Sequence, residues 1–304
     1  MALTLGCVDF LDRTRPILDR QVQVPGLEIE PTRLKPMELL ARYTEFDVCE
    51  LPLFAYLGLG TDDYVALPVF PHRGFPHGSV AVHAGSGIQK PGDLAGRRVG
   101  TPGLFLSGTV WMRGILEVES IRWVIPALPR DSAAARITAA LVDRSKIQVE
   151  ETAADLSNLL EKGEIDAWIG PLPPACLERD SPAVRRLFPD YKSVEHAYAA
   201  RTRFVPALHT VVLRRRWKDK APLLVRLFER AREAGLKNLH NDNVFAVMLP
   251  WMRHHLEELK SLFGVDWVPA GYEANRAMID AALDYAARQG VTKGRGKAEE
   301  FFAG

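Results

Sequence analysis

The sequence predicts an α/β fold. Short apolar strands alternate with short helices through the first half of the chain, and the middle third repeats this alternation as a second α/β unit. The last third carries long helical patterns instead. Because strands that alternate with helices favour a mainly parallel sheet flanked by helices, two such units are expected within the 304 residues.

The elements of the first unit follow from its apolar runs and its prolines. A proline near the start of a helical pattern fits the first turn of a helix, where its missing N–H costs nothing. Strands are predicted at 3–8, 27–34, 46–49, 65–70 and 79–83, with helices at 14–19, 36–43 and 52–59.

The second unit starts from a helical turn, a glycine stop and a strand between residues 90 and 102. Ser107 or Thr109 is suited to cap a helix that runs to about residue 119. Residues 127–146 are poorly patterned and are expected to form a variable excursion. Further strands are predicted at 147–151 and 165–169, with a helix at 156–162 between them.

The last third is expected to be helical after one returning strand. Apolar residues recur at helical spacing in three segments, and Pro250 predicts a kink or break in the second of them. The polar tail after Gly290 is expected to be loosely held. The strand is predicted at 208–213 and the helices at 222–239, 244–263 and 272–288.

Composition excludes several classes of function. The chain has 39 Lys and Arg against 38 Asp and Glu, a net charge of +1, whereas nucleic-acid binders usually carry a basic excess. No stretch approaches the ~20 apolar residues that span a bilayer. The first residues lack a signal-peptide pattern, so a cytoplasmic protein is expected. Its three cysteines form no CxxC pair, which favours buried thiols over a zinc ribbon or a disulfide framework.

Residues 88–100 read I-Q-K-P-G-D-L-A-G-R-R-V-G. This run resembles the P-x-D-L-x-G-K/R-x-V signature of type II periplasmic-binding-protein folds, where it marks the crossing from the first lobe into the second. Other segments, taken in order, resemble the 4,5-dihydroxyphthalate decarboxylase family over about residues 3–290. They are 12–16 (D-R-T-R-P), 46–50 (F-D-V-C-E), 68–77 (P-V-F-P-H-R-G-F-P-H), 110–114 (V-W-M-R-G), 186–191 (R-L-F-P-D-Y), 209–212 (H-T-V-V) and 271–276 (G-Y-E-A-N-R).

The resemblance implies a two-lobed type II periplasmic-binding-protein-like fold, each lobe a mainly parallel sheet flanked by helices. Lobe one comprises residues 1–98 and 205–304, including the C-terminal helices, and lobe two comprises residues 99–204. Ligands bind such α/β sheets near the carboxyl ends of the strands, so the substrate is expected between the lobes. The segment 49–56, C-E-L-P-L-F-A-Y, is less polar than is common in the family, which bears on the substrate more than on the fold.

Candidate site residues follow the predicted strands of lobe one. His72, Arg73 and His77 lie in one loop, where they suit an anionic substrate and where histidine transfers protons near neutral pH. A solvated surface loop is the plain alternative. Arg13 and Arg15 offer forks that match carboxylates. Two positions apart on a helix they do not share a face, so one is expected to face the cleft and the other to pair with Asp12 or Asp19.

Glu50 and His209 complete this set. Glu50 ends a strand, where it either orients a histidine or accepts a phenol proton, or else serves as a helix N-terminal acid. His209 begins the returning strand and faces either the cleft or the interior.

On lobe two, Thr101, Ser107 and Thr109 surround a helix start, where free N–H groups favour a carboxylate. No Walker A lysine pattern or early GxGxxG supports a nucleotide. His254 and Glu257 show a metal-like spacing, but a solvated helix face is expected there, and the basic run at 214–216 is expected to be solvated as well.

The resemblance implies decarboxylation of a dihydroxyphthalate-like aromatic carboxylate. Each carboxylate of 4,5-dihydroxyphthalate is para to a hydroxyl, so the ring supplies the electrons and no cofactor is required. Arg73 with Arg13 or Arg15 is expected to anchor the retained carboxylate, with Phe54, Phe75 and Phe105 near the departing one. His72 or His77 is expected to donate the proton, with Glu50 or His209 as orienter or base. A metal recruited by His72, His77 and Glu50 stays open.

Three other functions fit the same fold, since fold does not fix function. The first is a solute-binding protein for a small anion, which the missing signal pattern disfavours. The second is another lyase or dehydratase acting on a cyclic carboxylate, and the third is a ligand sensor. The expected partner is a small anionic aromatic substrate, with no nucleic acid and no membrane, and a homo-oligomer stays open.

Overall fold

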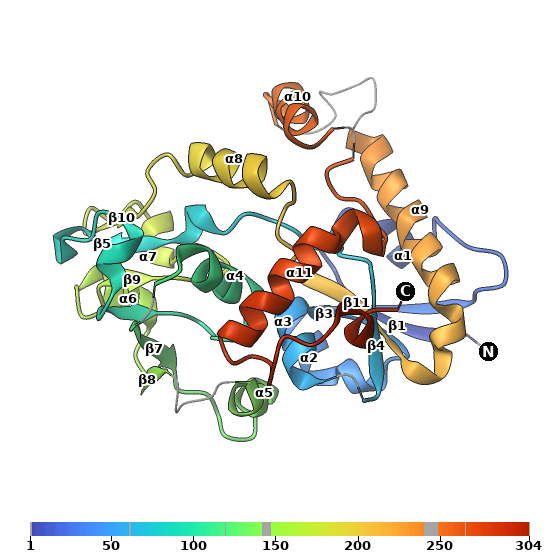
Figure 1. The fold of residues 1–304 in the computed structure, drawn as a ribbon, viewed down its shortest axis with the longest axis horizontal. Helices are drawn as coiled ribbons and strands as arrows, with labels where there is room; N and C mark the ends of the chain where they lie inside the picture. The colour runs from blue at the N-terminus through green and yellow to red at the C-terminus, as the bar shows by residue number, and fades with distance from the viewer. Residues whose placement is uncertain are drawn as a thin grey trace.

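The protein, seen in a computed structural model, is described for residues 2–60, 62–118, 120–141, 147–239, 249–264 and 266–303. These residues form two β-sheets, one of five strands and one of six, which occupy two halves of the molecule side by side (Figure 1). The predicted two-lobed α/β architecture is therefore confirmed.

The first sheet has the order β2-β1-β3-β11-β4. Its strands are β1 (Leu3–Val8), β2 (Ile29–Leu34), β3 (Val48–Pro52), β4 (Tyr64–Leu67) and β11 (His209–Arg214). The second sheet has the order β10-β5-β9-β6-β7-β8. Its strands are β5 (Ala81–His83), β6 (Arg98–Gly100), β7 (Arg122–Pro126), β8 (Gln148–Thr152), β9 (Ala167–Trp168) and β10 (Val184–Arg186).

Helices flank both sheets. Those that precede β11 are α1 (Arg15–Leu18), α2 (Pro36–Arg42), α3 (Leu53–Leu59), α4 (Ser107–Leu116), α5 (Ala133–Leu141), α6 (Leu156–Glu161), α7 (Ala175–Glu178) and α8 (Tyr191–Thr202). Those that follow it are α9 (Ala221–Leu239), α10 (Met252–Phe263), α11 (Tyr272–Arg288) and α12 (Ala298–Phe301).

Each sheet is mixed, with a parallel part and antiparallel strands. β1 pairs in parallel with β2 and β3, and β6 does so with β7 and β9. β11 runs antiparallel to β3 and β4, and β5 runs antiparallel to β9 and β10. β5 and β11 follow the two crossings between the halves, so the antiparallel pairs arise where the chain enters each sheet.

The first crossing comes earlier than the sequence predicted. β5, which we assigned to the segment 1–98 of lobe one, pairs with β9 and β10 in the second sheet. The chain therefore changes sheets between Leu67 and Ala81. β5 is short and apolar, so its sequence does not indicate which sheet it joins. The signature at residues 88–100 leads into β6, which lies within the second sheet.

The first sheet is covered on both faces. Alternate residues of β1 point to opposite sides, so that Leu5 and Cys7 pack with α1 and α9 whereas Val8 belongs to the cluster with α2, α3 and α11. Burial of apolar area on both faces contributes about 25 cal/mol per Å². This double cover fixes the strands whose ends carry the candidate residues.

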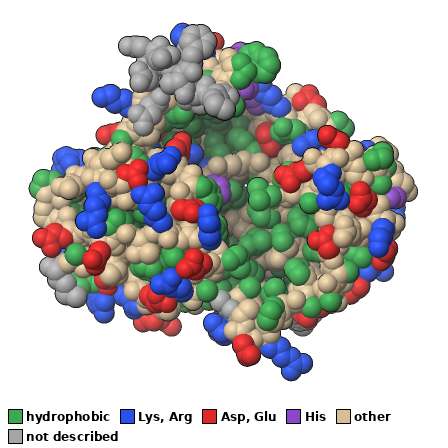
Figure 2. Space-filling model, turned by 180° about the vertical axis from the view of Figure 1, so that it is seen from behind, with side chains coloured by type: hydrophobic (Ala, Val, Ile, Leu, Met, Phe, Trp, Pro, Cys, Tyr) green, Lys and Arg blue, Asp and Glu red, His purple; other side chains and the backbone are tan. Residues whose placement is uncertain are grey.

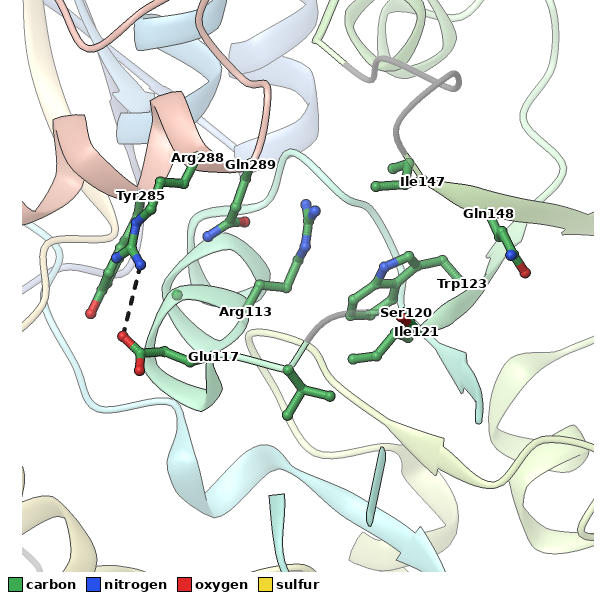
Figure 3. A pocket seen from close by; sticks show the side chains of 12 residues that line it. Arg113, Glu117, Ser120, Ile121, Trp123, Ile147, Gln148, Tyr285, Arg288 and Gln289 are labelled. Atoms are coloured by element: carbon green, nitrogen blue, oxygen red, sulfur yellow. Dashed lines mark ion pairs between the residues drawn. The ribbon is translucent and has the colours of Figure 1, made fainter. Parts of the chain in front are cut away.

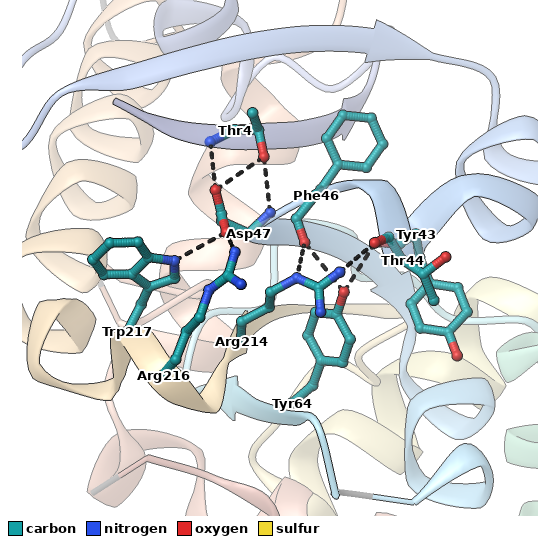
Figure 4. Close-up of polar contacts among 9 residues, drawn as sticks. All are labelled: Thr4, Tyr43, Thr44, Phe46, Asp47, Tyr64, Arg214, Arg216 and Trp217. Atoms are coloured by element: carbon teal, nitrogen blue, oxygen red, sulfur yellow. Dashed lines mark hydrogen bonds and ion pairs between the residues drawn. The ribbon is translucent and has the colours of Figure 1, made fainter. Parts of the chain in front are cut away.

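Asp47 fastens the start of β3 to its neighbours (Figure 4). Its carboxylate accepts hydrogen bonds from Thr4 N at 3.2 Å, Trp217 Nε1 at 2.9 Å and Arg216 Nη2 at 2.6 Å. Burial alone raises the pKa of Asp47, but the donors Arg216 and Trp217 outweigh it and hold the pKa below its usual value. The network joins β1, β3 and the turn after β11, three residues before Glu50.

Close contacts join the two halves at α4 and α11. A Cβ at Gly114 would collide with the ring of Tyr285, so glycine lets these helices approach. Trp111 Nε1 also donates to Ala207 O at 2.7 Å, in the segment that returns to the first sheet. Ridge-to-groove contact of this kind holds elements in one orientation.

The C-terminal tail differs from the prediction. We expected it to be loosely held, but Phe302 is buried in the core and Ala303 N donates to Ala66 O at 2.7 Å. Tyr56 OH donates to Phe301 O at 2.6 Å. Phe301 and Phe302 are the two aromatic residues of an otherwise mostly polar tail, so the sequence shows no periodic apolar pattern that would predict their burial.

The second half and the last third contain further differences. The sequence reading did not anticipate β7, β10, α7 or α8, and α5 lies in the expected excursion. α10 begins at Met252, after the proline predicted to break the helix, and the predicted segment 244–248 lies outside the described residues. His254 is exposed, as expected. Within the described residues, no helix has both the length and the apolar character needed to cross a bilayer.

Candidate active site

Glu50 and His209 form the centre of the candidate site. Glu50 lies on β3 opposite Val211 of β11, and His209, two residues earlier on β11, projects from the same face. His209 Nδ1 lies 2.6 Å from Glu50 Oε1, and Val8 N donates to Glu50 Oε2 at 3.1 Å. Glu50 is fully buried. With Glu50 ionised, Nδ1 carries the proton and the Nε2 of His209 is the acceptor.

His72 lies against this pair. Its ring meets the His209 ring edge-on, with 4.8 Å between centroids. The His72 carbonyl accepts from Leu208 N at 2.7 Å and His209 N at 3.2 Å, which fixes the two histidines relative to each other. Burial, with smaller contributions from His209 and Arg13, lowers the pKa of His72 to about 3. His72 is therefore neutral at pH 7 in the free protein.

The Nδ1 atom of His72 is buried and has no hydrogen-bond partner within the described part of the chain. An unsatisfied buried nitrogen costs about 1–3 kcal/mol. A buried nitrogen without a partner calls for an explanation, and a catalytic or ligand-binding role is one such explanation.

Arg13 supplies positive charge beside His72. It follows β1, and the chain there packs closely on Gly235 of α9. Its Nε donates to Asp12 Oδ1 at 3.2 Å, whereas its Nη1 is buried and lacks a partner among the described residues. Arg13 is one of the charges that lower the pKa of His72, so the two side chains act on one another through space.

Arg15 and Arg73 are placed differently from Arg13. Arg15 is 70% exposed and pairs with Asp19 at 3.7 Å, as the expected surface arginine does. Arg73 is turned into the protein, where it donates to Val205 O, Pro269 O and Asn275 Oδ1 and stacks on Phe70. These partners engage Nη1 and Nη2, so Arg73 holds the His72 segment in place, and only its Nε lacks a partner among the described residues.

His77 lies in separate surroundings. Its ring contacts Phe188 and Tyr198, and Nδ1 is 3.7 Å from Glu195. Burial lowers the pKa of His77 to about 4 and raises the pKa of Glu195 to about 7. Phe75 packs edge-on against the same Tyr198. His77 thus belongs to an aromatic cluster with α8, whereas His72 belongs with β3 and β11.

The lobe-two residues lie at the start of α4. The Thr101 and Thr109 hydroxyls are buried and 3.1 Å apart, so one donates a hydrogen bond to the other. Ser107 Oγ accepts from Phe54 N at 3.5 Å and links α4 to α3. Phe54 and Phe105, expected near the departing carboxylate, are buried in the hydrophobic core. Their nonpolar character reflects packing between the helices.

His72, His77 and Glu50, left open above as joint metal ligands, do not come together in the structure. The described residues contain no group of three or more His, Cys, Asp or Glu side chains suited to a metal ion. His77 lies apart from His72 and Glu50, because its ring packs against Phe188 and Tyr198.

Sequence reasoning missed two contributors. Phe10 is 56% exposed and meets the His72 ring edge-on at 5.8 Å between centroids. An aromatic residue directly after a strand was the available signal. Asn275 is buried, accepts from Arg73 and donates to Pro269 O and Gly271 O. Its partner Arg73 lies 202 positions away, so no local pattern reveals it.

The surface around the junction is hollowed. Figure 2 shows the rear face with a depression between its two halves, and hydrophobic side chains line its walls.

Comparisons with known proteins agree with this architecture. No protein-family model matches the chain. The chain is 32% identical over 307 residues to a 4,5-dihydroxyphthalate decarboxylase of Comamonas testosteroni, covering 96% of this chain and 93% of that protein. It is 33% identical over 190 residues to a 4,5-dihydroxyphthalate decarboxylase of Pseudomonas putida, covering 59% of this chain and 74% of that protein.

Solved structures resemble the fold at low identity. The periplasmic aliphatic sulphonate binding protein SsuA of Escherichia coli superposes with a TM-score of 0.53 at 17% identity, covering 99% of this chain and 97% of that one. A putative sulfonate-binding SsuA of Methylobacillus flagellatus gives a TM-score of 0.55 at 12% identity, covering 99% and 91%. These matches support the periplasmic-binding-protein-like fold alone.

Proposed function

Because the chain belongs to the 4,5-dihydroxyphthalate decarboxylase family, we propose that Glu50, His209, His72 and Arg13 form its active site. The protein is a carboxy-lyase that decarboxylates a dihydroxyphthalate-like aromatic carboxylate. The observation that supports the site best is the 2.6 Å contact between Glu50 and His209 directly beside His72.

The Glu50–His209 pair suits a base that acts on a phenol. Glu50 fixes the ring orientation and holds the proton on Nδ1, so Nε2 accepts the hydrogen bond of a substrate hydroxyl. As that O–H bond weakens, electron density moves through the ring to the para carbon, which bears the carboxylate. The pair therefore activates the ring without any oxidant or reductant.

His72 is the proton donor in this proposal. The ipso carbon takes one proton, its bond to the carboxylate breaks, CO2 leaves, and aromaticity and the phenol return. The low pKa of His72 in the free protein arises from burial and positive neighbours. A bound dianion places negative charge beside the ring and raises this pKa, so the substrate itself makes His72 a competent acid.

Arg13 anchors the carboxylate that stays on the ring. Its Nη1 has no protein acceptor within the described residues, whereas Arg73 has three. A guanidinium matches a carboxylate with charge-assisted hydrogen bonds. The sequence led us to expect Arg73 with Arg13 or Arg15 as the anchor, and this proposal keeps Arg13 and drops Arg73.

The cleft and the cellular compartment belong to this proposal as well. The hollow between the halves in Figure 2 is the expected binding place. A cytoplasmic location is proposed because Cys7, Cys49 and Cys176 are free and buried, which suits a reducing compartment.

The experiment is a double-mutant cycle on the base pair. We expect Glu50→Gln and His209→Gln each to lower kcat for conversion of 4,5-dihydroxyphthalate to 3,4-dihydroxybenzoate by about 10²–10⁴-fold. The double variant should be little slower than either, since the residues act as a unit. Arg13→Gln should chiefly raise KM, and exposed His254→Gln is the control. Additive losses in the cycle would contradict the paired role.

A further inference from the structure

A second cavity lies at the junction of the two halves, away from the Glu50–His209 pair. It has a volume of about 540 Å³ and is lined by the C-terminal part of α4, the start of β7 and the end of α11 (Figure 3). This volume is within the range of small-molecule sites. The mechanism proposed above uses none of its residues.

Arg113 lines this cavity and has no ion-pair partner among the described residues (Figure 3). Its guanidinium carbon lies over the Trp123 ring, 5.4 Å from the ring centroid. Burial lowers the pKa of Arg113 to about 10, so the group is positive at neutral pH. In the described ranges no carboxylate or carbonyl pairs with it. A partly desolvated cation of this kind favours an anionic ligand.

The other charges of the lining are compensated. Arg288 pairs with Asp284 at 2.9 Å and with Glu117 at 3.8 Å. Arg113 is therefore the charge that a ligand would neutralise. Its neighbours Trp123, Ile121 and Tyr285 give the cavity apolar and aromatic walls.

Gln289 supplies an acceptor in the same space. Its Nε2 donates to Val110 O at 2.9 Å, which orients the amide, and its Oε1 is buried without a hydrogen-bond partner among the described residues. Figure 3 shows the amide beside Arg113. The cavity thus combines an unpaired cation with an unpaired acceptor.

We propose that this cavity is a second ligand site, which binds a small hydroxylated aromatic carboxylate. The carboxylate pairs with Arg113, the hydroxyl donates to Gln289 Oε1, and the ring packs against the apolar wall that includes Trp123. A ligand here contacts α4 of one half and α11 of the other, so its binding joins the two halves.

Calorimetry with 4-hydroxybenzoate tests the site on the whole protein. The wild type should bind one more molecule of 4-hydroxybenzoate than Arg113→Gln does, or the variant should bind at that site about 10- to 100-fold more weakly. A loss of this size is expected when a charge-assisted hydrogen-bonded pair is removed. Arg276→Gln, which removes an exposed guanidinium from α11, the other helix that lines the cavity, should bind as the wild type does.

A ligand-side comparison needs no variant. 4-Hydroxybenzyl alcohol, which lacks the carboxylate, should not occupy the site, and Arg113→Lys should show an intermediate affinity because lysine keeps the charge without the fork. Equal stoichiometry and affinity in the wild type and Arg113→Gln would overturn the proposal, as would the absence of binding to the wild type. Decarboxylation by Arg113→Gln without added ligand should match the wild type, which separates this test from that of the active site.

Discussion

For single residues, the sequence predicted which side chains lie near one another better than it predicted where each side chain points. Glu50 lies on β3, His209 begins β11 and His72 follows β4, and the structure places the His209 ring in contact with both Glu50 and His72. The direction of Arg73 was beyond prediction, because its acceptor Asn275 comes from a distant helix. Two arginines in similar loops therefore differ. Among the described residues, the terminal nitrogen Nη1 of Arg13 has no partner, whereas both terminal nitrogens of Arg73 donate to protein acceptors and only its Nε has none.

His77 gives a prediction about pH and stability. Burial lowers its pKa to about 4, so between about pH 4 and the usual histidine value of about 6.5 the unfolded chain binds the proton and the folded protein does not. The stability contribution is thus present above that range and is lost as the pH falls through it. Glu195, whose pKa is raised to about 7, has the opposite slope.

We expect His77→Phe to reduce the loss of stability between pH 7 and pH 5. Phenylalanine does not titrate. It also removes the buried ring nitrogens that lack a hydrogen-bond partner, which should stabilise the folded state by about 1 kcal/mol. Urea unfolding at the two pH values measures the difference, with exposed His254→Gln as control. A loss as steep as that of the wild type would show that His77 does not resist protonation in the folded state.

At the scale of elements, long amphipathic helices and apolar strands were predictable, and short or polar elements were not. α9 and α11 agree closely with their apolar periodicity. α8 is polar and buries only Tyr198 and Ala199, so its hydrophobic pattern is weak. Its available signal was the cap, since Asp190 accepts from Ser193 N at 3.1 Å.

The docked C-terminus gives a prediction at this scale. Phe302 is buried, forms a parallel β-bridge with Ala66 of β4 and packs against Phe70. We expect Phe302→Ala to cost about 3–5 kcal/mol of unfolding free energy, as large-to-small core changes do. Chemical denaturation measures it, and Met37→Ala, at a half-exposed position, should change stability by less than about 0.5 kcal/mol. A similarly small effect of Phe302→Ala would mean that the tail is not part of the core.

At the scale of the whole molecule, the motif order predicted the two-lobed fold and the family, and both are confirmed. The boundary between the lobes was harder to predict from the sequence, because β5 joins the second sheet by pairing with β9 and β10, which lie about a hundred positions further along the chain. Contacts between the halves are also nonlocal. Lys192 of α8 pairs with Glu258 of α10 at 2.7 Å. This ion pair links α8, which follows β10 of the second sheet, to α10, which follows β11 of the first sheet.

In the proposed mechanism, His72, the histidine beside the Glu50–His209 pair, transfers the proton that replaces CO2. The most direct measurement is kcat for 4,5-dihydroxyphthalate with His72→Gln and the control His254→Gln, each checked for folding by its thermal melting. The proposed site predicts a fall of about 10²–10⁴-fold for His72→Gln and no change for the control. A His72→Gln variant that is folded and turns over as fast as the wild type would contradict it.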